Sequence, residues 1–302
     1  MYSLNTNNIL PKYIVTYVFI LAMVAVAYFA KDREIVLPEI AAMAIALWVW
    51  QDEAWLRQPD KIFILPSCTA AIGFAINMLH IPYLSKLMLV LIAMLVVMIL
   101  FKYSFPPALA TGFLPIVTNA YEWSFMIAIL ITTFILMLGV LVFKLNKDIK
   151  REVEFNRKGL FIYFTITTIW MSIAWAFKIE QMALIPPITV VIYESINMKM
   201  YSLKIAIKQV AILTISITFA VLLSNYIENW LILSILFLLM MNLLLKLFRM
   251  KIPAVYAFPF LIFVFPPEKV SGLPIASLAV SVVCFTMVYL YHKYIKSKIK
   301  LV

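Results

Sequence analysis

Apolar residues fall into long runs that recur along the whole chain and are separated by short polar segments. Runs of about 18–23 residues are long enough to cross a bilayer as helices, at 1.5 Å per residue. Such runs span residues 12–30, 62–81, 84–101, 123–144, 159–177, 204–226, 229–248 and 273–294. Four shorter runs lie between them, at 35–50, 105–120, 182–197 and 253–267. The pattern predicts an all-α, polytopic transmembrane bundle of about twelve segments.

The two halves of the chain share residues at a constant offset. Residues 27–31 (Ala-Tyr-Phe-Ala-Lys) are similar to residues 174–178 (Ala-Trp-Ala-Phe-Lys), and 101–114 is similar to 248–261, in both cases 147 positions apart. A fixed period indicates an internal repeat. We therefore predict two tandem repeats of six segments, with these boundaries: first repeat 1–148, charged cytosolic linker 149–158, second repeat 159–302.

The positions of Lys and Arg indicate whether the short runs cross. If all twelve segments cross and both termini are cytosolic, 20 of the 25 Lys and Arg lie on the cytosolic side. If the short runs only re-enter, the count is 12 inside and 13 outside. The positive-inside rule thus favours twelve crossings with cytosolic termini. An even number per repeat makes the two repeats parallel, about a pseudo-two-fold axis along the membrane normal.

Composition narrows the class of protein further. The chain is 65% hydrophobic and 13% charged, with a mean hydropathy of +1.03. A typical soluble domain has a much lower share of apolar residues and about twice the share of charged ones. The net charge of +11 comes from basic loops, so we expect no nucleic-acid partner. No basic residue precedes the first run, which we interpret as a retained helix and not a signal peptide. Cys68 and Cys284 lie inside apolar runs, without metal or redox spacing, so we expect no metal and no cofactor.

Prolines stand at the start of every short run. A proline suits the first turn of a helix, where its missing N–H would have no partner. A short helix that starts below the membrane surface turns its free N–H groups and positive end inward, which favours an anion or polar solute. The alternative is that these prolines only begin interfacial helices. The predicted substrate-binding residues are Pro38, Glu39, Pro106, Pro107, Thr111, Pro186, Pro187, Thr189 and Pro253.

The acidic and hydroxyl side chains of these runs leave two readings open. Glu39 and Glu194 would serve proton coupling or cation contact, or would lie near enough to headgroups to be solvated. Thr111 and Thr189 would line a cavity, or would bond back to carbonyls of the preceding turn.

A resemblance to a known family lies in the fifth segment. Residues 105–111, Phe-Pro-Pro-Ala-Leu-Ala-Thr, resemble the His-Pro-Pro-Ala-Gly-Ala-Thr signature of the integral membrane HPP family. Gln58-Pro59 followed by 70–73 (Ala-Ala-Ile-Gly) is similar to that family's Gln-Pro loop and small-residue helix. The resemblance implies a multi-pass, transporter-like protein, and plastid and cyanobacterial members are associated with nitrite transport. The position of the signature histidine is occupied by Phe105 here and by Ile252 in the second half. We therefore do not extend nitrite transport from the family to this chain.

Motifs of the common enzyme classes are missing from the sequence, so we expect no enzyme. We predict a transporter or permease for a small solute, with anions among the candidates, whose site lies between the repeats near mid-membrane. The alternative is a non-transporting scaffold or subunit of a larger membrane complex. A polar interior would favour transport, and a solid Leu/Phe centre a scaffold. We expect a multi-pass protein of the plasma membrane, with the lipid bilayer and a small molecule or ion as partners, and with a homo-oligomer left open.

Overall fold

The computed structural model describes residues 9–151, 155–179 and 183–296, with side chains up to Tyr294. Within these residues every long apolar run forms a helix long enough to cross a membrane. The long helices are α1 (Ile9–Ala30), α4 (Pro59–Asn77), α5 (Tyr83–Phe101), α7 (Trp123–Val142), α8 (Arg157–Ala176), α10 (Leu203–Ser224), α11 (Trp230–Phe248) and α14 (Leu273–Leu290). The prediction of an all-helical polytopic bundle is confirmed.

The short runs also fold where they were predicted. The first is α2 (Pro38–Ala44) continued by the π-helical turn η3 (Ile45–Val49), the second is α6 (Pro107–Thr118), and the third is α9 (Pro186–Asn197). The fourth consists of the 3-10 turns η5 (Pro253–Tyr256) and η6 (Phe258–Phe260) and the single turn α12 (Leu261–Val264). Small elements η2 (Arg33–Ile35), α3 (Glu53–Leu56), α13 (Pro267–Val270) and η7 (Tyr291–Lys296) lie in the connections or follow α14.

The long and short elements differ in what surrounds them. Almost every residue of α2, η3 and α6 is buried. The long helices instead turn large apolar side chains outward, and Phe29, Leu100 and Leu247 are each about three-quarters exposed. An apolar outer surface is stable only against lipid. The short elements therefore form the core, and the long helices form the wall that faces the bilayer.

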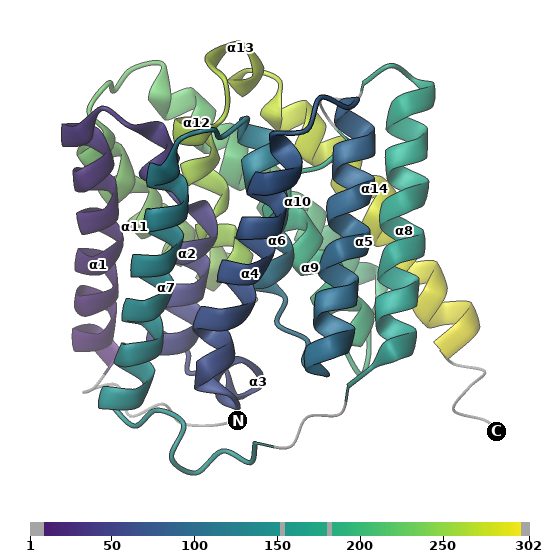
Figure 1. Ribbon diagram of the computed structural model, residues 1–302, viewed down its shortest axis with the longest axis horizontal. Helices are drawn as coiled ribbons and strands as arrows, with labels where there is room; N and C mark the ends of the chain where they lie inside the picture. The colour runs from purple at the N-terminus through teal and green to yellow at the C-terminus, as the bar shows by residue number, and fades with distance from the viewer. Residues whose placement is uncertain (1–8, 152–154, 180–182, 297–302) are drawn as a thin grey trace.

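The short elements carry the chain from one end of the bundle to the other. The loop before α6 lies beside α3, because the Tyr103 hydroxyl donates to the Ala54 carbonyl at 2.9 Å. The loop after α6 lies beside η2, because the backbone N–H groups of Tyr121 and Glu122 donate to Glu34 at 2.9 and 2.8 Å. In Figure 1 α3, the start of α1 and the end of α14 lie at the lower end of the bundle, and α13 lies at the upper end. We call the lower end inner and the upper end outer, after the predicted orientation.

Contacts between the two halves are reciprocal. In the first half the fifth element, α6, packs on the second element of the other half, α9; in return α2 packs on η5. Likewise α1 packs on α11, and α5 packs on α8. Contacts between α2 and α6 and between α9 and η5 close the short elements into a ring. Reciprocity of this kind is what a pseudo-two-fold axis produces; the duplication itself stays a prediction from the sequence.

Helix ends repeat the same backbone conformation at the offset seen in the sequence. Lys31 and Lys178 have φ of 56° and 57°, and Lys102 and Arg249 have φ of 49° and 52°. The left-handed conformation costs a non-glycine residue roughly 1–2 kcal/mol. Its recurrence at positions 147 apart adds a structural correspondence to the sequence repeat.

The fourth short run departs from the predicted helix. Pro259 stands in its middle and cannot donate the backbone hydrogen bond that an α-helix needs there. Together with Pro253 it divides the run into 3-10 turns, and only residues 261–264 complete an α-helical turn.

Candidate functional site

The predicted site residues are all buried in the ring of short elements. Pro38 and Glu39 open α2, Pro106 and Pro107 open α6, Pro186 and Pro187 open α9, and Pro253 opens η5. The starts of α2 and α9 point to the outer end, and those of α6 and η5 to the inner end. The structure therefore brings these residues into one ring but not to one point.

Most of that ring is apolar. Phe105, Phe113, Ile188 and Phe258 have no exposed surface. A centre filled in this way is closed to a solute in the conformation described.

The two predicted threonines bond within the protein. The Thr111 hydroxyl lies 2.8 Å from that of Thr69 and donates to the Ala108 carbonyl at 3.1 Å. The Thr189 hydroxyl donates to the Pro186 carbonyl at 2.6 Å. Of the two readings left open by the sequence, back-bonding to the preceding turn is the one that the structure contains.

Close packing of α4 on α6 accompanies the Thr69–Thr111 contact. A Cβ atom added to Gly73 would lie 2.0 Å from the carbonyl oxygen of Gly112. The two backbones approach so closely that only glycine fits at position 73. In this structure the segments that carry the family resemblance are thus a packing surface between two helices.

Glu39 is the exception among the predicted residues. It is 2% exposed, and neither of its carboxyl oxygens has a hydrogen-bond partner within the described residues. Its position in the first turn of α2 places it at the positive end of that helix. On insertion scales an ionised carboxylate at mid-membrane costs about 2.5–3.5 kcal/mol. Glu194, near the inner end of α9, is by contrast only partly buried.

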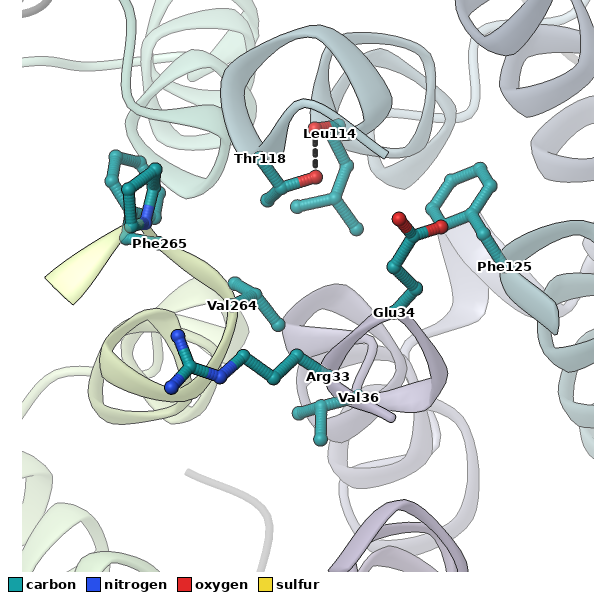
Figure 2. A pocket seen from close by; sticks show the side chains of 9 residues that line it. Arg33, Glu34, Val36, Leu114, Thr118, Phe125, Val264 and Phe265 are labelled. Atoms are coloured by element: carbon teal, nitrogen blue, oxygen red, sulfur yellow. Dashed lines mark hydrogen bonds between the residues drawn. The ribbon is translucent and has the colours of Figure 1, made fainter. Parts of the chain in front are cut away.

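An outer cavity of about 170 Å³ opens above the start of α2 (Figure 2). Its lining residues are Arg33, Glu34, Val36, Leu114, Thr118, Phe125, Val264, Phe265 and Pro266. Val36 lines this cavity, and the chain continues through the extended residue Leu37 into α2, whose second residue is Glu39. In Figure 2 Arg33 and Glu34 extend to different sides of the cavity.

Arg33 and Glu34 were not among the residues predicted from the sequence, because they lie in the short polar connection between two apolar runs. Glu34 accepts hydrogen bonds from the first residues before α7, and so fixes η2 to that helix. Burial raises the pKa of Glu34 above its ordinary value, and these backbone hydrogen bonds partly oppose the rise. Arg33 is exposed, so the cationic group of this cavity is in contact with solvent.

A larger cavity, of about 880 Å³, opens at the inner end between α1 and α11. Tyr13, Tyr17, Trp50 and Tyr256 form its back, and its basic residues are Lys246, Arg249 and Lys251. We call it the inner groove. None of its lining residues is acidic.

The two cavities lie at opposite ends of the same two elements. The outer cavity contacts Val36, before α2, and Val264, at the end of α12. The inner groove contacts Val49, at the end of η3, and Tyr256, at the end of η5. Each cavity is lined by both halves of the chain, with the buried carboxyl of Glu39 between them.

Comparison with known proteins identifies the family. No curated protein and no solved structure gives a significant match to the chain. A family model described as "HPP, transmembrane region" matches residues 2–152, half of the chain and the half that contains the Phe-Pro-Pro signature. The chain is therefore an integral membrane protein that belongs to the HPP transmembrane family.

Proposed function

We propose that the chain is a transporter for a small anionic solute, with its site between the two halves. The observation that carries the proposal is the pair of cavities at opposite ends of α2–η3 and η5–α12, with the unpartnered carboxyl of Glu39 between them. An alternating-access protein needs access routes from both faces to one central site.

The reciprocal packing of the two halves would allow the rocking movement that alternating access requires. Because α1 packs on α11 while α5 packs on α8, one half can rock against the other and open one end as it closes the opposite end. The packed centre then corresponds to a closed state. Broken and proline-started elements at the interface between repeats are the usual location of a transporter's binding site.

The charges favour an anion. Arg33 stands at the outer cavity, and Lys246, Arg249 and Lys251 stand at the inner groove. Cationic groups at both mouths raise the local concentration of anions. The positive end of the helix dipole at the start of α2 favours negative charge further in.

We further propose that Glu39 carries a proton together with the anion. A carboxyl group that holds its proton is neutral and can donate a hydrogen bond to an anion, whereas an ionised one would repel it. When the site opens to water the proton is released with the solute. Glu39 would thus couple anion movement to the proton gradient.

The test is uptake of small inorganic and organic anions into proteoliposomes with and without an inward proton gradient. We expect gradient-driven uptake by the unmodified protein and at least about a tenfold loss of gradient dependence in Glu39→Gln. Glu268→Gln changes an exposed carboxyl outside both cavities and should behave like the unmodified protein. Equal gradient dependence in Glu39→Gln would remove Glu39 from the mechanism.

A scaffold is the second candidate, favoured by the apolar packing of Phe105, Phe113 and Phe258 at the centre. It predicts no anion flux in proteoliposomes with correctly folded protein. Such a result would refute transport of the anions tested, and would leave the family membership and the fold unchanged.

A further inference from the structure

The inner groove is much larger than a small anion requires, and it opens sideways. Its mouth contains Leu10, Ile14 and Leu239, which are 68%, 54% and 55% exposed on the lipid-facing wall of the bundle. The basic residues stand at one end, where α11 leaves the membrane. The groove thus joins an apolar opening toward the bilayer to a cationic edge.

Along α11 the apolar and cationic parts are separated by the length expected of a lipid. Leu239 and Arg249 are ten residues apart, which is about 15 Å along a helix. That distance places the basic edge at the level of headgroup phosphates when Leu239 lies at the level of acyl chains.

A buried polar group also faces this space. Tyr256 is 0% exposed and lines the groove, and its hydroxyl lies near those of Tyr13 and Tyr17. The Tyr13 hydroxyl accepts from the Trp50 indole N–H at 3.4 Å. A wall of aromatic rings that carry hydroxyl groups suits the glycerol and ester region of a lipid.

We propose that the inner groove binds an anionic phospholipid of the cytosolic leaflet, with its phosphate at Lys246, Arg249 and Lys251 and one acyl chain between α1 and α11. Three basic side chains without an acidic lining residue favour a negative headgroup. The positive charge of Lys251 is partly offset by the nearby carboxylate of Asp52. We therefore expect Lys246 and Arg249 to contribute most of the attraction for the lipid phosphate.

The reciprocal interface between α5 and α8 also has a groove, of about 530 Å³, whose lining residues include no charged side chain. This groove lies along the outer half of the two helices, so it differs from the inner groove both in charge and in its position along the bundle. The lipid proposal concerns binding alone and is tested without transport; a lipid phosphate at these basic residues would compete there with the anionic solute of the proposed function.

The experiment measures lipid binding to purified full-length protein by native mass spectrometry and by thermal stabilisation. The probes are phosphatidylglycerol and phosphatidylcholine with identical chains, and inorganic phosphate as the soluble anion. We expect phosphatidylglycerol to bind about tenfold more tightly than phosphatidylcholine, and phosphate to give no stabilisation.

Variants then locate the site. The triple variant Lys246→Gln, Arg249→Gln, Lys251→Gln should abolish the preference for phosphatidylglycerol. A matched triple variant, Lys147→Gln, Lys150→Gln, Arg151→Gln, removes the same charge from the segment between α7 and α8 and should retain the preference. Equal affinity for both lipids, equal loss in both triple variants, or stabilisation by phosphate alone would each overturn the proposal. Because no flux is measured, these outcomes are independent of whether the protein transports a solute.

Discussion

The contact between Gly73 and Gly112 predicts which of two glycine-to-alanine substitutions destabilises the protein more. An added Cβ at position 73 would lie 2.0 Å from the Gly112 carbonyl oxygen and 3.0 Å from the side chain of Pro115. Ordinary contact begins at 3.4 Å, so α4 and α6 must separate by about 1.4 Å. Backbone blocks the new atom, so no side-chain rotation relieves the clash.

The expected cost of Gly73→Ala follows from three contributions. Overpacking typically costs about 1–3 kcal/mol, and a backbone obstacle puts this case near the upper end. Separation of the helices also weakens the hydrogen bond between Thr69 and Thr111, worth roughly 0.6 kcal/mol in a membrane. Replacing glycine within a helix returns up to about 1 kcal/mol. We therefore expect a net loss of about 2–3 kcal/mol.

Gly112→Ala should cost less stability than Gly73→Ala, although the nearest atom to the added Cβ is almost as close. Its Cβ would meet the Sδ atom of Met94 at 2.1 Å. Methionine is flexible and can move aside, so with the helix gain the net loss should stay below about 1 kcal/mol. Unfolding by SDS in mixed micelles, followed by helical circular dichroism, measures both losses. Ala75→Val, on the exposed side of α4, is the control. A loss in Gly112→Ala equal to that in Gly73→Ala would refute this account of the contact.

Three further outcomes are expected. A double-mutant cycle of Thr69→Val and Thr111→Val, measured in the same assay, should give a coupling of roughly 0.6 kcal/mol, because each hydroxyl keeps a backbone carbonyl when its partner is removed; no coupling would contradict the contact. Because the pKa of Glu34 is raised, its contribution to stability grows as pH falls toward 4.5 and is lost as pH rises through the raised value. Glu34→Gln should therefore flatten the pH dependence of the unfolding midpoint. An unchanged slope would show that Glu34 is not the source of that dependence. Finally, in a cysteine-free background, Glu268→Cys should react with an impermeant maleimide on intact cells and Lys150→Cys only after permeabilisation; the reverse pattern would invert the orientation.

The positions of the helices were predictable because hydropathy is a local property. In lipid every backbone polar group must be satisfied within its own segment, so an apolar run of sufficient length has few alternatives to a helix. The short runs were assigned as crossings only through the count of Lys and Arg. The structure agrees with that assignment, since the loops that flank α6 lie at opposite ends of the bundle.

The site was less predictable, because it depends on residues far apart in the sequence. Glu39 could be found, since a carboxyl inside an apolar run is conspicuous on its own. The inner groove could not, because Tyr13 and Tyr256 meet only when α1 packs on the second half. Nor does a run of apolar residues reveal that Pro259 will divide it into 3-10 turns.

The family model and the two cavities together suggest how the halves have diverged. If the halves arose by duplication, as the offset of 147 predicts, both began with the same signature, yet the second half now has Ile252, Pro253 and Ala254 where the first has Phe105, Pro106 and Pro107. A pseudo-two-fold axis offers two equivalent positions for a site, at the contacts of α6 with α9 and of α2 with η5. The first is joined by the hydrogen bond of Tyr193 to Ser104 at 2.7 Å, whereas the large inner groove lies against the second. Both contacts are packed, but only the divergent copy, η5, also lines the inner groove. The transport site proposed at α2 and η5 therefore does not include position 105, where the family signature has histidine and this chain has Phe105.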